Sequence, residues 1–390
     1  MRLLVGVSSV GLGHVKRSLS IVREIVKLRP DTSVGWLCAQ PALSYLESVG
    51  ENILPESYEM VSLSSAFEEK SVGGSVDSLE AVRVAYNLAK QNYQVIRKIV
   101  AEYDLLVQDE FLETLFAHRW EQNPTLPSCR AVITDFVDIA LKGFNPVRWV
   151  FGAYANRMLR RSLLMNDARV FADSINSVPP SLRGWVQTNF LVTGPIVLVL
   201  VDDREVGKLR RRLLEDSGKR RIVCFTIGGT AVGKHILDFA WQNRRELSDA
   251  LDALLLFLTG PRVDFREYNG DEKRVLAVGF TTQATAYFQA SDCVVTQGGA
   301  STLNELEALG KPTVCIPIKG HWEQERNAWR FKTRDNYAVL SPTQLDATTL
   351  INSIIRVLEV QAPSKPNFKG GAARLAAEKI VGLLGYRRKV

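Results

Sequence analysis

The chain has 390 residues, of which 46% are hydrophobic and 23% charged, and it carries a net charge of +7. This length allows two domains with full cores, and the composition is that of a globular protein and excludes a disordered one. No apolar run approaches the roughly 20 residues that cross a bilayer. The modest positive charge would attract anionic lipid or phosphorylated substrates as well as nucleic acid, and we expect no nucleic-acid partner.

The first strand of the chain is expected to run from Leu3 to Ser9, with no secretory leader before it. The cysteines are scattered without zinc spacing and suit buried thiols in a reducing cytoplasm. The five positions are Cys38, Cys129, Cys224, Cys293 and Cys315. We therefore expect a cytoplasmic protein without a metal site.

A glycine turn at Gly11 and Gly13 follows this strand, and a helix is expected from about Val15 to Leu28. Strand, glycine turn and helix form the Rossmann-like arrangement. His14 lies at the N-terminus of the helix, where the helix dipole lowers the pKa of an imidazole. A neutral His14 would serve as a general base. A histidine that only caps or packs locally is the alternative.

Three carboxylates end predicted strands in the first half of the chain. The run DLLVQDE predicts a strand that ends in Asp109 and Glu110, and AVITDF predicts another that ends in Asp135. Acidic groups at strand ends would orient an acceptor hydroxyl or accept its proton. Helix capping is an equally good interpretation of an aspartate between strand and helix.

A helix expected from Arg148 to Leu164 combines large apolar residues with Arg157, Arg160 and Arg161. An apolar face beside a basic face is typical of an element at a membrane surface. A packed helix with a solvated basic face is the commoner alternative.

The pattern of the amino terminus restarts after Gly194-Pro195. Arg221 to Ile227 predicts a new strand that opens on Gly228-Gly229-Thr230, while Asp202-Asp203 at the junction is interpreted as a linker or cap. Two similar halves indicate an α/β protein of two Rossmann-like, doubly wound domains that face a cleft.

The expected domain bounds follow from this junction. Residues 1–194 would form the acceptor-side domain and residues 195–365 the nucleotide-sugar domain. A helix in residues 366–390 is expected to pack back on the first domain.

The stretch from Asp292 to Asn327 predicts strand, turn, helix, strand, a polar loop with Gln324 and Asn327, and a further helix. Ser301 and Thr302 lie in the first helical turn, where free N–H groups favour a phosphate. Glu305, one turn further on, suits the hydroxyls of a ribose. An ordinary βαβ unit remains the alternative.

Several motifs in this region occur in a specific order: a phenylalanine after a glycine (VGF), ASD before a strand, a GGA loop, a helix glutamate, GKP and a glutamine/asparagine segment. From about Ile222 to Leu358 the chain resembles the family 28, MurG-like glycosyltransferases, which have the two-domain GT-B fold. At the amino terminus, GLGHVKRSL is similar to the first glycine loop of these enzymes, including their archaeal relatives.

The resemblance implies a UDP-sugar donor. It places Phe280 and Thr281 at the base and Glu305 at the ribose. The first turn of the 300s helix and the loop from Gly228 to Thr230 would hold the diphosphate. Glu323, Gln324 and Asn327 would face the sugar. The implied donor-binding residues are Gly13, Gly228, Gly229, Thr230, Phe280, Thr281, Gly298, Gly299, Ala300, Ser301, Thr302, Glu305, Glu323, Gln324 and Asn327.

The expected activity is an inverting, metal-independent and cofactor-free transfer of a sugar to a lipid-linked acceptor at an anionic, inner membrane surface. N-acetylglucosamine is the expected sugar, although HWEQERNA replaces the paired glutamines of many MurG-like enzymes. The expected base is His14, Asp109, Glu110 or Asp135. A soluble small-molecule acceptor, a UDP-sugar 2-epimerase and a non-catalytic sugar-nucleotide-binding protein are the alternatives.

Overall fold

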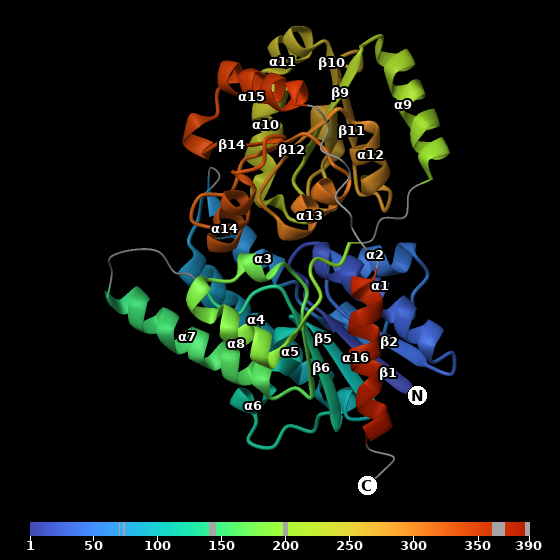
Figure 1. The fold of residues 1–390 in the computed structure, drawn as a ribbon, viewed down its shortest axis with the longest axis vertical. Helices are drawn as coiled ribbons and strands as arrows, with labels where there is room; N and C mark the ends of the chain where they lie inside the picture. Colours follow the sequence, from blue (N-terminus) through green and yellow to red (C-terminus); the bar gives the residue numbers. More distant parts are fainter. Residues whose placement is uncertain (70, 73–74, 140–145, 198–201, 361–370, 387–390) are drawn as a thin grey trace. The chain divides into compact units, whose positions relative to one another are not determined.

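The computed structural model describes residues 1–69, 71–72, 75–139, 146–197, 202–360 and 371–386. It divides the chain into two compact α/β units (Figure 1). Unit 1 comprises Met1–Phe67, Ser78–Leu198 and Lys369–Val390, and unit 2 comprises Glu68–Asp77 and Val199–Phe368. The expected bound at residue 365 and the basic tail from residue 387 lie outside the described residues.

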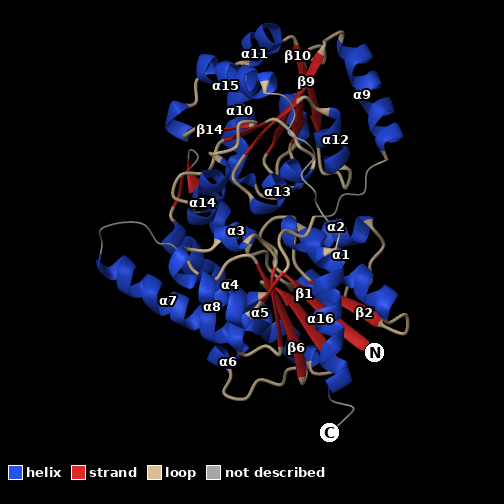
Figure 2. Ribbon diagram, in the orientation of Figure 1, coloured by secondary structure: helices blue, strands red, loops and turns tan. Residues whose placement is uncertain are grey.

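Unit 1 is built on a parallel sheet of six strands, in the order β2-β1-β5-β6-β7-β8. Its strands are β1 (Arg2–Val7), β2 (Ser33–Leu37), β5 (Leu105–Asp109), β6 (Cys129–Thr134), β7 (Ala168–Phe171) and β8 (Leu191–Val192). The inner strands are almost wholly buried, because helices cover both faces of a parallel sheet. Figure 2 shows the strands among these helices.

Helices from the first part of the chain, together with one near its carboxyl end, form two layers on this sheet. They are α1 (Gly13–Leu28), α2 (Ala42–Ser48), α3 (Ser64–Glu69), α4 (Ser78–Val100), α5 (Leu112–Leu115), α6 (Ala117–Trp120), α7 (Pro146–Leu164), α8 (Pro180–Asn189) and α16 (Ala372–Tyr386). Helix α16 packs against α1 and also contacts β6 and β7. Tyr93 of α4 packs with Leu4 and Leu106, and Leu159 of α7 packs with Val132, which places α4 and α7 on the other face.

Neighbouring residues of β5 therefore serve different faces of the sheet. Leu106 packs under α4, whereas Asp109 is hydrogen-bonded to residues of α1. Because side chains alternate along a strand, Gln108 faces the same side as Leu106. The end of β5 thus supplies one polar group to each face.

Unit 2 has a second six-stranded parallel sheet, in the order β11-β10-β9-β12-β13-β14. Its strands are β9 (Arg221–Thr226), β10 (Ala253–Leu258), β11 (Val275–Val278), β12 (Cys293–Thr296), β13 (Thr313–Cys315) and β14 (Tyr337–Val339), and residues of the first half add the hairpin β3 (Ser71–Val72) and β4 (Ser75–Val76). All six residues of β10 are buried, as its uninterrupted apolar sequence predicts. Two parallel-sheet α/β domains confirm the predicted fold class.

The helices of unit 2 also pack on both faces. They are α9 (Asp203–Ser217), α10 (Lys234–Gln242), α11 (Arg244–Leu251), α12 (Ala284–Ala290), α13 (Ala300–Ala308), α14 (Trp322–Phe331) and α15 (Ala347–Glu359). Leu237 of α10 and Ile354 of α15 pack with Phe225, whereas Phe288 of α12 packs with Cys224 on the opposite face. The Asp202 side chain accepts a hydrogen bond from the Arg204 N–H as the cap of α9, which confirms the capping interpretation of this residue.

One local prediction is wrong. Gln324 and Asn327, expected in a polar loop, lie in the first two turns of α14. The loop ends at His321, because Trp322, Ala328 and Phe331 form a buried helical face that the many charged residues between them conceal in the sequence.

Candidate active site

A buried polar cluster in unit 1 is centred on Asp109, the last residue of β5. One carboxylate oxygen lies 3.0 Å from Nδ1 of His14, and the other accepts hydrogen bonds from Arg17 Nε and Ser18 Oγ, each at 2.8 Å. His14, Arg17 and Ser18 are three and four residues apart, so α1 presents them on one face. The helix thereby surrounds a carboxylate that is completely inaccessible to solvent.

Arg17 connects the acidic strand ends, although the sequence pattern assigned it no role. Its guanidinium donates to Asp135 at 2.6 Å and to Glu110 at 3.3 Å, in addition to Asp109. Without this cation, three carboxylates at neighbouring strand ends would repel one another. The available signal was the spacing: an arginine three residues after His14 shares its helical face, which points to the strand ends.

Glu110 directly follows β5 and has a left-handed backbone with φ of 46°. This conformation is uncommon and costly for a residue other than glycine. It allows Glu110 to join the same cluster as Asp109, although successive strand residues point to opposite faces. One carboxylate oxygen accepts from Thr134 Oγ1 at 3.0 Å and from the Asp135 N–H at 2.9 Å, and the other lies 3.7 Å from Nε2 of His14.

The charges of the cluster overturn the expected pKa of His14. Burial and Arg17 oppose its imidazolium form, but the Glu110 carboxylate and the hydrogen bond with Asp109 outweigh them and raise the pKa of His14 to about 9. The predicted lowering by the helix N-terminus is therefore wrong. The carboxylates, about 95 residues away in the chain, dominate the weaker helix dipole.

The two acidic partners of His14, Asp109 and Glu110, have very different pKa values. Burial, together with Asp135, raises the pKa of Glu110 to about 8. Burial also opposes ionisation of Asp109, but Arg17 and His14 lower its pKa to about 2. Asp109 is therefore a permanent anion, whereas His14 and Glu110 exchange protons in the alkaline range.

Two glutamines connect the glycine loops of unit 2 to one another by hydrogen bonds. Gln297 Nε2 donates to the Ile227 carbonyl, immediately before Gly228, and Gln297 Oε1 accepts from Gln324 Nε2 at 3.3 Å. Gln324 Oε1 in turn accepts from the N–H groups of Gly298 and Ile318, both at 3.2 Å. These loops follow β9, β12 and β13, which are neighbours in the sheet, so the pair Gln297 and Gln324 fixes three adjacent strand ends.

Gly298 is held especially closely. Its carbonyl accepts from Asn327 Nδ2 at 3.0 Å, and a β-carbon at this position would lie 2.5 Å from the carbonyl oxygen of Gln324. Glycine is therefore required by the close approach of two backbones. Gln324 and Asn327, expected to contact a sugar, are buried and direct these polar atoms to the loop.

Helix α13 begins at Ala300, directly after Gly299, and no side chain caps its N-terminus. Ser301 and Thr302 are half-buried in its first turn. The first N–H groups of a helix that lack an intrahelical acceptor attract an anion. Glu305 is buried further along the helix, where its carboxylate accepts from Thr285 Oγ1 of α12 at 3.1 Å.

The other predicted donor residues lie around the same edge of the sheet. Phe280 and Thr281 are half-buried between β11 and α12, and Thr281 Oγ1 accepts from the Gln283 N–H at 3.1 Å. Glu323 is half-buried in the first turn of α14. Gly228, with φ of 70°, turns the chain away from β9 toward Gly229 and Thr230. Gly13 is separate from this group, because it starts α1 in unit 1.

Comparison with protein families agrees with this architecture. Residues 223–380 match the glycosyltransferase family 28 C-terminal domain. An uncharacterized glycosyltransferase of Methanosarcina mazei is 23% identical over 348 residues, with 84% of this chain and 83% of the relative covered. One of Methanopyrus kandleri is 26% identical over 232 residues, which are 59% of this chain and 64% of that relative.

A relative of named activity covers less. The UDP-N-acetylglucosamine--N-acetylmuramyl-(pentapeptide) pyrophosphoryl-undecaprenol N-acetylglucosamine transferase 2 of Bacillus thuringiensis is 34% identical over 198 residues, 48% of this chain and 53% of the relative. Among solved structures, Arabidopsis thaliana UGT89C1 complexed with UDP covers 99% of both chains with a TM-score of 0.61 and 14% identity, which supports the fold. The predicted resemblance is thus confirmed: residues 223–380 match the family 28 C-terminal domain, and the chain has the GT-B fold of glycosyltransferases.

Proposed function

We propose that the protein transfers N-acetylglucosamine from its UDP conjugate to a lipid-linked acceptor, with inversion and without a metal. The proposed binding of the donor rests on one observation. The loops after β9, β12 and β13 are hydrogen-bonded to one another beside the uncapped N-terminus of α13. This arrangement offers preorganised N–H groups to a diphosphate whose negative charge grows as the glycosidic bond breaks. The structural neighbour UGT89C1 was solved in complex with UDP, which supports the choice of nucleotide.

In the proposed mechanism the donor residues divide the nucleotide sugar among them. Glu305 accepts hydrogen bonds from the ribose hydroxyls, and Phe280 and Thr281 border the uracil. The first turn of α13 stabilises the leaving diphosphate. Gln324 acts by holding Gly298 in place, because its oxygen already accepts from two backbone N–H groups. Glu323 is left to face the sugar.

The proposed proton acceptor is the pair of His14 and Glu110. The acceptor hydroxyl forms a bond to the anomeric carbon, the bond to the diphosphate oxygen breaks, and the hydroxyl proton passes to the pair. Asp109 holds the imidazole by its Nδ1 and stabilises the imidazolium that results. UDP leaves with the bonding electrons, so a single displacement inverts the configuration.

The proposed lipid acceptor rests on the exposed face of α7. Trp149, Val150 and Tyr154 are 74%, 60% and 58% exposed near its amino end, and Arg157 and Arg161 follow on the exposed side. Exposed aromatic and basic groups on one helix suit the interface of an anionic membrane. The Bacillus thuringiensis relative is named for an undecaprenol-linked substrate, which supports the same class of acceptor. We therefore propose that the protein acts at the inner face of the cytoplasmic membrane.

No described helix is both long and apolar enough to cross a membrane.

The proposal is tested by incubating the purified chain with UDP-N-acetylglucosamine and a membrane lipid extract, while UDP release and the glycolipid are followed. Parallel reactions with other UDP-sugars and with GDP- and dTDP-sugars define the donor. A water-soluble fraction of the same cells tests a soluble acceptor. Appearance of a 2-epimer without any acceptor would indicate the isomerase alternative, and absence of turnover with every donor would refute the enzyme proposal.

A further inference from the structure

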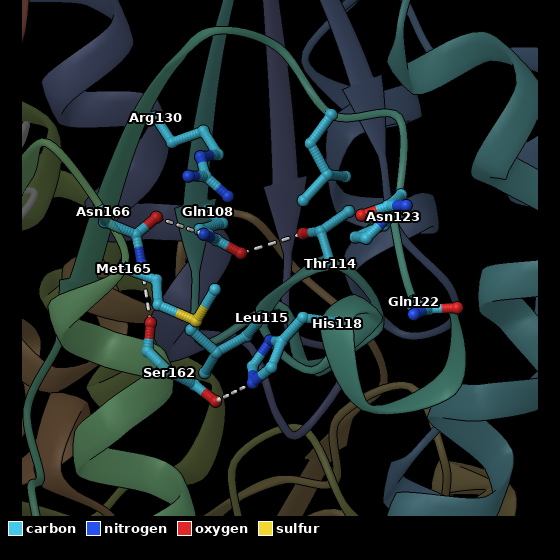
Figure 3. Close-up of a pocket in the computed structure, with 12 residues that line it drawn as sticks. Gln108, Thr114, Leu115, His118, Gln122, Asn123, Arg130, Ser162, Met165 and Asn166 are labelled. Atoms are coloured by element: carbon cyan, nitrogen blue, oxygen red, sulfur yellow. Dashed lines mark hydrogen bonds between the residues drawn. The ribbon is translucent and has the colours of Figure 1, made fainter.

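A cavity of about 290 Å³ in unit 1 is lined by residues of α5, of α6 and of the carboxyl end of α7 (Figure 3). It is bordered by Gln108 of β5, Arg130 of β6 and Asn166, which precedes β7. Arg130 is the second residue of its strand, opposite Leu106, whereas Asp109 and Asp135 come at the carboxyl ends. Gln108 and Asp109 point to opposite faces of the sheet. The cavity is therefore separate from the cluster around His14.

The walls of this cavity form an ordered polar network. Gln108 Nε2 donates to Asn166 Oδ1 at 2.5 Å, and Gln108 Oε1 accepts from Thr114 Oγ1 at 2.9 Å. Asn166 is anchored further through the carbonyl of Ser162 at 3.1 Å. Buried amides that satisfy one another in this way rigidify their surroundings. The side chain of Arg130 takes no part in this network.

The side chain of Arg130 has a buried polar atom without a hydrogen-bond partner among the described residues. This atom is its Nε. Figure 3 shows its guanidinium directed toward the space in front of Gln108. A buried donor left unpaired is costly, and the cost is greater for a charged group. No Asp or Glu occurs among the described residues that line the cavity, so they offer no carboxylate to balance this charge.

The surroundings of His118 report the same excess of positive charge. Its Nε2 lies 3.4 Å from Ser162 Oγ at the wall of the cavity. Burial, and then the charges of Arg119, Arg161 and Arg130, lower the pKa of His118. At neutral pH the imidazole is consequently uncharged and sits in a positive field.

We propose that this cavity binds a small organic anion, whose phosphate or carboxylate group pairs with Arg130. The exposed amides of Gln122 and Asn123 at the rim would bind the polar body of the ligand, and Leu115 and Leu126 its carbon atoms. The volume is at the lower limit of ordinary ligand pockets and equals the space of about ten water molecules. It is large enough for a molecule of the size of glycerol 3-phosphate.

The site is independent of the proposed transfer reaction, and its test does not depend on activity. The chain has four histidines, so the His118 signal is assigned in NMR spectra of the full-length protein by His118→Gln. UDP at saturating concentration occupies the proposed donor site. We expect millimolar glycerol 3-phosphate to shift the His118 signal and raise its pKa, because a bound anion offsets the three arginines. Glycerol, the neutral control, should leave the signal unchanged.

Variants locate the anion. Arg130→Gln should weaken the response at least about tenfold, as expected for loss of one charge-assisted pair. Arg130→Lys should weaken it less, and Arg23→Gln, which removes an exposed arginine of α1, should not affect it. If Arg130→Gln folds poorly, Asn123→Asp at the exposed rim places a negative charge at the entrance and should also weaken binding.

Malate in place of glycerol 3-phosphate separates the two ligand chemistries, and a response to either anion supports the proposal. No response to either would overturn it. Equal affinity in wild type and Arg130→Gln would overturn it as well.

Discussion

Asp109 Oδ1 lies 3.0 Å from Nδ1 of His14, and Glu110 Oε2 lies 3.7 Å from the other ring nitrogen, so successive residues of one strand end hold both sides of the imidazole. Asp109 is ionised at all ordinary pH values, whereas the pKa of Glu110 is close to that of His14. The imidazole therefore has a fixed anion on one side and a proton-exchanging partner on the other.

The first prediction concerns pH. The pKa of His14 is raised to about 9 and that of Glu110 to about 8. A base must be unprotonated, so kcat/KM should rise as pH increases from neutral through this range. The free energy of unfolding should fall over the same range. Folded His14 keeps its proton above the ordinary pKa of 6.5 and loses it as pH rises through about 9, so the stabilisation by that proton is lost. Initial rates and thermal unfolding midpoints from about pH 6 to about pH 10 test both trends, and a rate that is flat over this range would contradict the assignment.

The second prediction concerns the positioning of the imidazole. Asp109→Asn should disfavour the imidazolium, with kcat lowered by about 10²- to 10⁴-fold. His14→Ala should have an effect of similar size, since both changes remove the same proton transfer. UDP affinity should stay the same in both variants. Asp31→Asn, a change at an aspartate with a 71% exposed side chain, is the matched control, and a large loss of kcat in that variant would contradict the specific role of Asp109.

The third prediction distinguishes two roles of Gln324. If this residue holds Gly298 and the loop after β13 in place, Gln324→Ala should weaken UDP and UDP-sugar by similar factors. The free energy of unfolding should fall by about 1–3 kcal/mol, because buried N–H groups lose their acceptor. Isothermal titration with both ligands decides the question. Weaker binding of the sugar conjugate with unchanged UDP affinity would restore Gln324 as a direct sugar contact.

The fourth prediction uses a pair of glycines in unit 2. Gly298→Ala would press a β-carbon against the Gln324 carbonyl and should lower the unfolding midpoint and UDP affinity together. Gly207→Ala, inside α9 with open space around it, should instead stabilise by about 0.5–1 kcal/mol. Equal unfolding midpoints for the two variants would contradict the close packing described at Gly298.

The fifth prediction concerns α7. Replacing Trp149 and Tyr154 by alanine should reduce binding to vesicles that contain anionic phospholipid, because these side chains would lie in the interface. Trp329→Ala removes a tryptophan of equal exposure, 75% against 74%, from α14 of unit 2. Vesicle sedimentation compares the variants. An equal loss in both would show general hydrophobic adsorption and not a surface on α7.

The fold could be predicted because its strands are short, buried apolar runs that end in glycines or acids. Asp109, Glu110 and Asp135 were expected near a site for the same reason, and the structure joins them. The sequence pattern assigned Arg17 no role, because a charged residue in a helix is usually solvated, and its burial depends on carboxylates that are distant in sequence. Those same carboxylates reverse the expected pKa of His14.

The helix α14 illustrates a different limit. Its glutamine, glutamates and arginines look like a polar loop, whereas Phe331 packs against Tyr337 and Leu303 on the buried face of the helix. The roles of Gln324 and Gln297 follow from hydrogen bonds between loops 26 to 70 residues apart in the chain. Sequence spacing contains no information about such contacts.

The most direct test of the proposed function is mass spectrometry of lipids after incubation with UDP-N-acetylglucosamine, with and without EDTA. We predict a lipid heavier by one N-acetylhexosamine in both reactions, formed in step with UDP and greatly reduced with His14→Ala. A product that disappears with EDTA would contradict the metal-independent mechanism. UDP release without any glycosylated lipid would contradict the lipid acceptor, which is the central claim.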